Sequence, residues 1–178
     1  MLLKNIHEED CIMLIVGIDP GMAGAIAFID YNDSIFESRC IYDMPTLSTE
    51  GKGKTKKGVP KKHTVLDEYE VREILLSYDQ IDHLYLEKAQ SMPGQGAPGT
   101  FSYGCSYGII RGICVGLQIP YTLIHPATWK KVMMKDMDRG KDAAIVRAKQ
   151  MFPTADIGKK DGRAEALLIA VYGAKENK

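Results

Sequence analysis

Two apolar segments joined by a turn cluster open the chain, and this arrangement constrains the fold most. Residues 14–19 read "LIVGID", residues 20–24 read "PGMAG", and residues 25–30 read "AIAFID". Short apolar runs on either side of a Gly/Pro-rich turn are typical of two strands in a β-hairpin. The sequence therefore predicts a sheet that begins as an antiparallel meander, with residues 34–45 as its third strand, closed by Pro45.

Strand and helix patterns alternate after the meander. Strands are predicted over residues 83–87 and 121–126, and helices over 64–78, 100–118, 141–153 and from 161 onward. The first helix is expected to have Thr64 as its N-cap with Asp67 at N3. Residues 46–63 and 88–99, rich in Gly, Pro and Lys or Gln, are predicted to be mobile loops. This order predicts an α/β fold with a mixed five-stranded sheet, in which parallel strands follow an antiparallel meander and helices flank both.

The bulk composition is that of one soluble globular domain. The chain has 178 residues, 45% of them hydrophobic, and a net charge of +0, so we expect one domain over 13–178, large enough for an ordinary enzyme, preceded by an extension over 1–12. Either Met1 or Met13 could be the native start. The acidic N-terminus argues against a secretory signal, and no apolar run reaches the roughly 18 residues of a membrane span. The four cysteines lack a CxxC pair, which favours reduced thiols and a cytoplasmic location.

Four carboxylates stand at the ends of predicted apolar elements. Asp19 and Glu87 each end a strand, while Asp161 and Glu165 lie i, i+4 on one face of the last helix. Functional sites gather at the carboxyl ends of strands in open α/β sheets, so these acids are expected to converge if the last helix packs there. Carboxylates that lie so close need a cation, and oxygen ligands without His or Cys favour Mg²⁺ or Mn²⁺. Two such ions, about 3.5–4 Å apart, are typical of phosphodiester hydrolysis.

Each acid taken alone also has an ordinary structural interpretation. Asp19 before a Pro-Gly pair suits a turn, Glu87 before a lysine suits a surface ion pair, and Asp161 before a glycine suits a helix N-cap. Only the combination of two strand-end acids with an acid pair on an apolar helix face favours a catalytic metal site.

Glycine recurs at every fourth position of the helix predicted over 100–118. The four residues are Gly104, Gly108, Gly112 and Gly116. Each costs a helix roughly 1 kcal/mol relative to alanine, so the pattern needs a reason. A face without Cβ atoms permits close packing either on the sheet of the same chain or on the same helix of a second copy. Both interpretations stay open at this point.

Basic and aromatic residues supply candidate contacts to nucleic acid. Residues 52–62 contain six lysines and no acid, and a second group of lysines follows the predicted strand over 121–126. These segments are either solvated or bind phosphates. The candidates are Lys54, Lys56, Lys57, Lys61, Lys62, Lys130 and Lys131. Phe101 or Tyr103, with the loop over 91–99, could wedge or read bases, although aromatic residues at a helix start more often pack. Trp129 is expected to be a core residue and His125 a structural one.

Four segments of the sequence resemble one known family. "VGIDPGMAGAIAFID", "LYLEKAQ", "HPATWKK" and "DGRAEALLIAVYG" resemble the RuvC-type Holliday junction resolvases of the RNase H-like superfamily, closest to the phage and chloroplast branch. The resemblance extends over roughly residues 14–174. "GRAEALLIA" is specific, whereas "GIDPG" also occurs in actin-like ATPases and sugar kinases.

The resemblance implies an RNase H-like fold and a homodimeric endonuclease that nicks two symmetric strands of a four-way DNA junction. It implies two Mg²⁺ ions per active site, with Mn²⁺ as a substitute, and it favours a glycine-lined contact between two copies. Asp19 matches the first-strand aspartate, Glu87 the fourth-strand glutamate and Glu165 the acid of the last helix. Asp161 matches a more variable position one turn earlier, and whether it contacts metal directly or supports a ligand stays open.

Three rival functions remain. Another RNase H-like nuclease, such as an RNA–DNA hybrid hydrolase, would keep the carboxylates without needing a symmetric dimer. A non-catalytic junction-binding protein would not need the acids at all. An actin-like ATPase is disfavoured, because 178 residues is short for its two lobes.

Overall fold

The computed structural model describes residues 12–54, 56, 58–90, 94, 96–137, 140 and 142–176. Three parts of the sequence discussed above therefore lie outside the described residues: positions 1–11 of the expected extension, Lys57, and most of the loop at 91–95. The strands are β1 (Met13–Asp19), β2 (Ala25–Asn32), β3 (Ile35–Asp43), β4 (Thr46–Lys54), β5 (Pro60–Leu66), β6 (His83–Glu87) and β7 (Tyr121–Ile124). The helices are α1 (Glu68–Leu76), α2 (Ala97–Gly116), α3 (Pro126–Met133), α4 (Ala143–Met151) and α5 (Asp161–Glu176).

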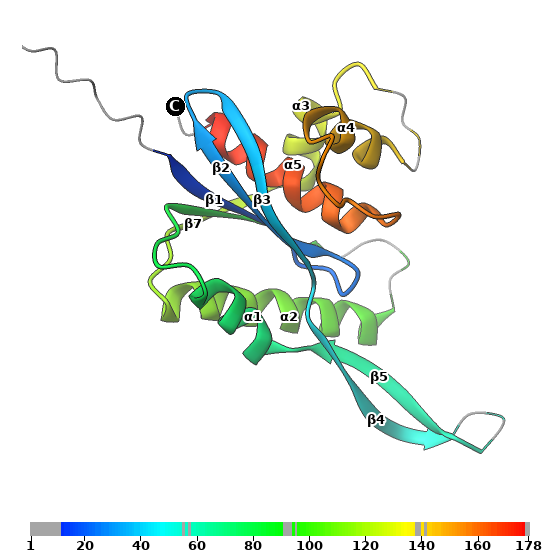
Figure 1. Ribbon diagram of the computed structural model, residues 1–178. Helices are drawn as coiled ribbons and strands as arrows, with labels where there is room; N and C mark the ends of the chain where they lie inside the picture. Colours follow the sequence, from blue (N-terminus) through cyan, green and yellow to red (C-terminus); the bar gives the residue numbers. More distant parts are fainter. Residues whose placement is uncertain are drawn as a thin grey trace, which may run out of the picture.

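The predicted mixed five-stranded sheet is confirmed. Its strand order is β3-β2-β1-β6-β7. The pairs β1–β2 and β2–β3 are antiparallel, and β1–β6 and β6–β7 are parallel. Helices α1 and α2 cover one face of this sheet and α3, α4 and α5 the other (Figure 1). The two faces of the sheet thus carry separate apolar clusters.

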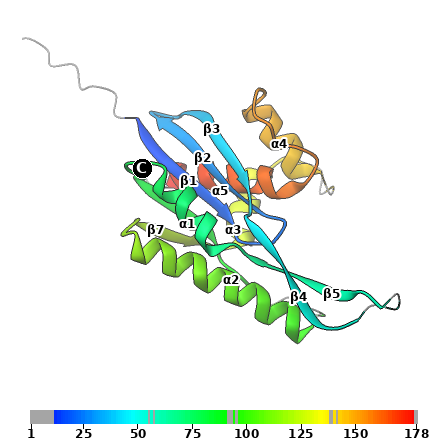
Figure 2. The same ribbon diagram turned by 60° about the horizontal axis from the view of Figure 1, so that its bottom comes forward.

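The prediction of a mobile loop over residues 46–63 is wrong. Strands β4 and β5 pair with each other as a separate two-stranded antiparallel sheet, which projects from the body of the molecule (Figures 1 and 2). Nearly all of its described side chains are exposed. A ribbon with no buried face has no need of the apolar/polar alternation by which a strand is recognised in a sequence.

Two further expectations about helix starts are corrected. Thr64 is not an N-cap: it pairs with Ser48 in the β4–β5 ladder. The N-cap of α1 is Asp67, whose side chain accepts a hydrogen bond from the Glu70 amide at 3.1 Å. The last predicted strand ends at Ile124, and α3, which was not predicted, begins directly after it with Pro126 at its first position. Proline suits that position because its missing N–H would have no partner there.

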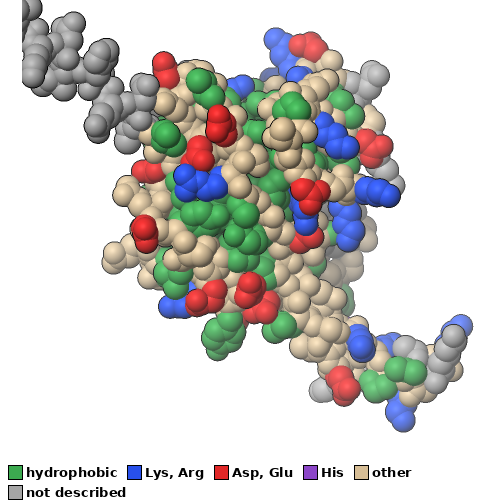
Figure 3. Space-filling model, in the orientation of Figure 1, with side chains coloured by type: hydrophobic (Ala, Val, Ile, Leu, Met, Phe, Trp, Pro, Cys, Tyr) green, Lys and Arg blue, Asp and Glu red, His purple; other side chains and the backbone are tan. Residues whose placement is uncertain are grey.

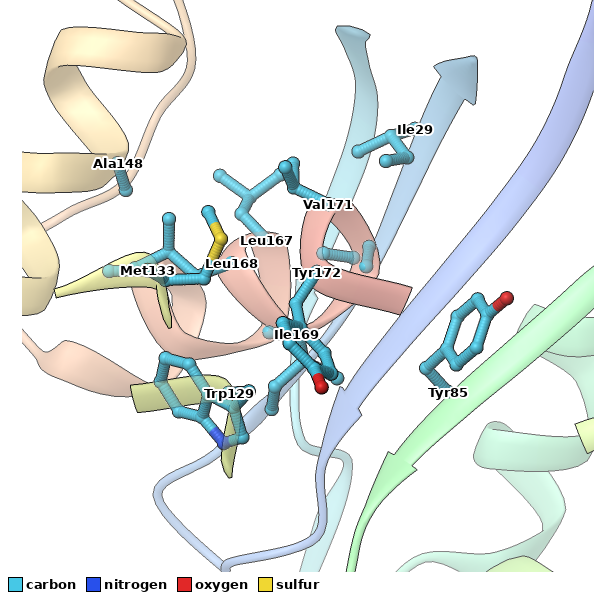
Figure 4. Close-up of a cluster of buried hydrophobic side chains, with 14 of the residues drawn as sticks. Ile29, Tyr85, Trp129, Met133, Ala148, Leu167, Leu168, Ile169, Val171 and Tyr172 are labelled. Atoms are coloured by element: carbon cyan, nitrogen blue, oxygen red, sulfur yellow. The ribbon is translucent and has the colours of Figure 1, made fainter. Parts of the chain in front are cut away.

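Helix α5 is the centre of the larger core. Its residues from Ala164 to Ala174 are buried apart from Glu165, because β1 and β2 lie on one side of the helix and α3 and α4 on the other. A helix covered on both sides can be apolar around its whole circumference. Figure 4 shows part of the cluster, to which Trp129 and Met133 of α3 and Leu168 of α5 belong.

The Tyr85 hydroxyl is buried in this core and has no hydrogen-bond partner in the described part of the chain. Burial raises the pKa of Tyr85 to about 12. An unpaired buried hydroxyl costs about 1–3 kcal/mol, so Tyr85→Phe is expected to keep or increase the free energy of unfolding in urea. Tyr85→Leu is the control, and it should destabilise because the ring packs against Gly173. A clear loss of stability in Tyr85→Phe would contradict the prediction.

None of the helices in the described part of the chain combines the length and apolar character that a bilayer crossing requires.

Candidate active site

Asp19 and Glu87 end neighbouring parallel strands. Ile18 of β1 pairs with Leu86 of β6, so the next residues of the two strands lie side by side at the carboxyl edge of the sheet. Adjacent strands are about 4.8 Å apart, and side chains alternate between faces. Ile15 lies four residues before Asp19, and Tyr85 lies two residues before Glu87, so each shares a sheet face with the acid of its strand. Both belong to the core cluster on the α5 side. Both carboxylates therefore face α5.

Glycines allow α5 to lie directly on these strand ends. A Cβ atom on Gly17 of β1 would stand 2.1 Å from the Ala166 carbonyl oxygen. A Cβ atom on Gly162 of α5 would stand 2.2 Å from the Ala23 carbonyl oxygen in the β1–β2 turn. Backbone therefore packs on backbone at both points. Glu165 lies between these two contacts on α5, and the close approach brings its carboxylate towards Asp19 and Glu87.

Asp19, Glu87 and Glu165 influence one another electrostatically. Burial raises the pKa of Asp19 to about 7; the Gly21 amide, 3.1 Å from its Oδ1, opposes this shift, and Glu165 and Glu87 add to it. The pKa of Glu87 is raised by burial and by Glu165. The indole N–H of Trp129 donates to Glu87 Oε2 at 2.6 Å and favours its ionised form.

Lys130 of α3 is the cation of this cluster. Its Nζ lies 2.7 Å from Glu165 Oε1, and the Glu165 side chain is only 16% exposed. Burial by itself would lower the pKa of Lys130, but Glu165 and, more weakly, the other two acids raise it above its ordinary value. The ammonium group thus compensates part of the negative charge that the three carboxylates gather.

No hydrogen bond or ion pair links Asp161 to the other three acids within the described part of the chain. Asp161 is the first residue of α5, is exposed, and makes no hydrogen bond or ion pair within the described part of the chain. Among the described residues, no three His, Cys, Asp or Glu side chains are placed so that they could hold a metal ion. The donor set of Asp19, Glu87 and Glu165 fits a hard divalent cation in its chemistry, but the present side-chain positions form no coordination shell.

A basic cavity of about 620 Å³ adjoins Glu165. Lys130, Lys131 and Lys135 line it together with residues of the α3–α4 connection. These lysines were predicted from the sequence as candidate phosphate contacts, and the structure places them in the wall of a cavity next to Glu165. An anionic chain could enter here with its charge compensated.

The two aromatic candidates of α2 differ in their surroundings. Tyr103 is half-buried, and its pKa is raised by burial and then by Asp19, Glu87 and Glu165, which places its hydroxyl in the field of the three acids. Phe101 is 75% exposed. Tyr103 therefore belongs to the candidate site, whereas Phe101 lies on the open surface of the first turns of α2.

The glycines of α2 face away from the sheet. Ser106, Ile110 and Cys114 form the buried face of the helix. Each glycine lies two residues from one of them, which is about 200° around the helix and therefore on the opposite face. A Cβ atom at Gly104, Gly108, Gly112 or Gly116 would meet nothing within 4 Å. The interpretation that these glycines pack on the sheet of the same chain is therefore wrong.

Two supports of the site were not predicted from the sequence. Trp129 is fully buried, as predicted, but its hydrogen bond to Glu87 joins residues that are 42 positions apart. Arg163 donates to both carboxylate oxygens of Asp43, at 2.6 and 3.0 Å, and to Asp156, at 2.9 Å. It thereby links the first turn of α5 to the end of β3. No local pattern around Arg163 points to a partner 120 residues away.

Comparisons with known proteins identify the fold. No family model matches the sequence, and no curated protein does. Among solved structures, Thermus thermophilus RuvC in complex with a Holliday junction substrate has a TM-score of 0.66 at 13% identity, over 93% of this chain and 94% of that one. The fowlpox virus resolvase in complex with Holliday junction DNA has a TM-score of 0.52 at 17% identity, over 91% and 99%. The chain therefore has the RNase H-like fold of RuvC and related Holliday junction resolvases.

Proposed function

We propose that this protein is a structure-selective endodeoxyribonuclease that resolves four-way DNA junctions by paired symmetric nicks. The observation that carries the proposal is the convergence of Asp19, Glu87 and Glu165 at the carboxyl edge of the sheet, next to a lysine-lined cavity. The solved structures of the same fold include two complexes with Holliday junction DNA.

In this proposal Asp19, Glu87 and Glu165 hold Mg²⁺, two ions per site with Mn²⁺ as a substitute, and Asp161 assists them. Bound metal would supply the attacking hydroxide and stabilise the leaving 3′-oxygen. The side chains of this chain do the positioning: the Gly21 amide holds Asp19, and the Trp129 indole holds Glu87. Lys130 pairs with Glu165 and also lines the cavity, so its ammonium can pass from the carboxylate to a DNA phosphate.

The proposal includes a homodimer built through α2. Its four glycines are exposed, and a Cβ atom at any of them would meet nothing within 4 Å, so the backbone of α2 is open to close approach at these positions. Two nicks placed symmetrically across a junction require two sites related by a two-fold axis. Light scattering of the purified protein would show the mass of a dimer if this part of the proposal is correct.

The Lys130–Glu165 ion pair favours a second candidate, a junction-binding protein without catalysis. A lysine that neutralises the acids permanently would leave them no role in binding metal. This candidate predicts that the protein binds four-way junctions and that no divalent cation makes it cut them.

The test is incubation with a synthetic four-way junction, a linear duplex and an RNA–DNA hybrid, each with Mg²⁺, Mn²⁺ or EDTA. The proposal predicts nicks at symmetric positions on two opposing strands of the junction, only with a divalent cation. Hydrolysis of the hybrid alone would identify another RNase H-like nuclease. Binding of the junction without nicks under every condition would support the non-catalytic candidate.

A further inference from the structure

The β4–β5 hairpin, here called the arm, begins beside the candidate active site. The Met44 amide, just before β4, donates to the Gly24 carbonyl at 2.9 Å, and the Asp67 amide, just after β5, donates to the Pro45 carbonyl at 2.9 Å. A Cβ atom on Gly24 would stand 2.2 Å from the Asp19 carbonyl oxygen. The root of the arm is therefore tied to the turn that follows Asp19.

The arm extends away from the body as a narrow ribbon (Figures 1 and 2). β4 has 9 residues and β5 has 7. At about 3.3 Å per residue the ribbon is roughly 20–30 Å long, which is most of one turn of B-DNA, about 34 Å. A two-stranded ribbon also fits the major groove, which is about 12 Å wide. The arm thus has the reach to follow a duplex that enters the active site.

The charge of the arm is positive and uncompensated. Lys54, Lys56, Lys61 and Lys62 are exposed, and within the described part of the chain none of them forms an ion pair. Figure 3 shows Lys and Arg side chains gathered along the projecting segment, with little acidic surface. Glu50 is the acid of the described part of the arm.

Packing does not explain why this ribbon carries such charge. Only Leu66, at the root, is buried, and β4 has no buried residue in its described part. Lysines that are exposed on both sides of a ribbon contribute little to folding. They do suit a polyanion, because each lysine that neutralises a phosphate releases a condensed counterion.

We propose that the arm grips the phosphate backbone of one duplex of the junction, next to the strand that is cut, and supplies affinity without taking part in the chemistry. This inference rests on the proposed function and assigns the arm a partner, the sugar-phosphate backbone of duplex DNA, which it contacts independently of sequence. The affinity it supplies is ionic and therefore depends on salt.

The test compares pairs of lysines in the full-length protein. Lys61→Gln with Lys62→Gln, and Lys54→Gln with Lys56→Gln, remove charge from the arm. Lys149→Gln with Lys175→Gln is the matched control, since these exposed lysines lie on α4 and at the end of α5. Junction binding is measured in EDTA at several salt concentrations, and cleavage separately at saturating protein with Mg²⁺. Thermal unfolding checks that each variant folds.

Each arm pair is expected to weaken junction binding at least about tenfold and to reduce the slope of log K against log salt by about 0.9 for every phosphate that is no longer neutralised. The single-turnover cleavage rate at saturation should stay within about twofold of the unmodified protein, and the control pair should change neither quantity. Junctions with progressively shortened duplexes should abolish the difference between the unmodified protein and the arm variants once the gripped base pairs are gone.

Three outcomes would overturn the inference. Arm variants that bind with unchanged affinity and salt slope would show that the lysines contact no phosphate. An equal loss in the control pair would show a general charge effect. A lower cleavage rate at saturation would place the arm in the chemistry. If the unmodified protein binds and cuts junctions while the arm variants match it, only this inference fails; if it neither binds nor cuts them, the proposed function fails as well.

Discussion

Asp19→Asn is expected to abolish junction cleavage while junction binding in EDTA stays unchanged. Asparagine keeps the size of the side chain and can still accept the hydrogen bond from the Gly21 amide, but it removes the charge that would hold a divalent cation. The charge stabilisation that a metal supplies is worth several kcal/mol, and each 1.36 kcal/mol is a factor of ten in rate, so we expect a loss of at least about 10³-fold. Nicks on each strand of a labelled junction measure it.

The same substitution is expected to raise the thermal midpoint of unfolding in EDTA. Burial, Glu165 and Glu87 hold the pKa of Asp19 at about 7, above the ordinary value of 3.8. A carboxyl group whose pKa is higher in the folded state costs stability as the pH rises from about 4 to 7, because it then loses its proton in an unfavourable site. The advantage of Asp19→Asn should therefore be small near pH 4 and largest above pH 7.

Asp79→Asn is the control, since Asp79 is exposed and follows α1, at the other end of the sheet. It should leave the cleavage rate unchanged. If Asp19→Asn cut junctions at the unmodified rate, the assignment of the active site would be wrong.

Gly17→Ala is expected to cost about 3 kcal/mol in the free energy of unfolding, as overpacking of a tight core does. The new methyl group would stand 2.1 Å from the Ala166 carbonyl oxygen and 2.6 Å from the Ala170 amide nitrogen. Backbone atoms cannot turn aside as a flexible side chain can, so α5 must move away from β1. Glu165 moves with the helix, and the cleavage rate should fall even at temperatures where the variant stays folded. Urea unfolding and nicking assays measure the two effects.

Gly108→Ala is the matched control in the same chain. A Cβ atom there meets nothing within 4 Å, and alanine favours a helix by about 1 kcal/mol relative to glycine. The monomer should therefore be as stable as the unmodified protein or more so. If light scattering showed the mass of a monomer for this variant and of a dimer for the unmodified protein, the contact between two copies would lie on this face. A Gly17→Ala variant as stable as the unmodified protein would contradict the close packing of α5 on β1.

Parts of the site could be predicted because they depend on local pattern. Asp19 and Glu87 end apolar runs of strand length, so their places at the carboxyl edge of the sheet follow from the strands themselves. Glu165 stands in an apolar run that has to be a buried helix. A buried helix must pack against other elements, and a carboxylate on it needs a cation, a hydrogen-bond donor or a proton there.

Other parts could not be predicted, because their cause lies in distant segments. The partner of Glu87 is Trp129 and the partner of Glu165 is Lys130, both on a helix that was not predicted from the sequence. The β4–β5 ladder buries no face and therefore leaves no periodicity to read.

The chain's own pattern determined the five strands of the main sheet, the buried helix α5 and the acids at their ends, because hydrophobic period and turn residues act over a few neighbouring positions. Tertiary structure alone decided which side chain neutralises Glu165. It also decided that the glycines of α2 face outward, whereas Gly17 and Gly162 allow α5 to pack directly on the strand ends. Finally, it decided that the lysine-rich segment forms a separate two-stranded ribbon. Those outcomes depend on atoms brought within a few ångströms of each other from far apart in the sequence, and no local pattern encodes such distances.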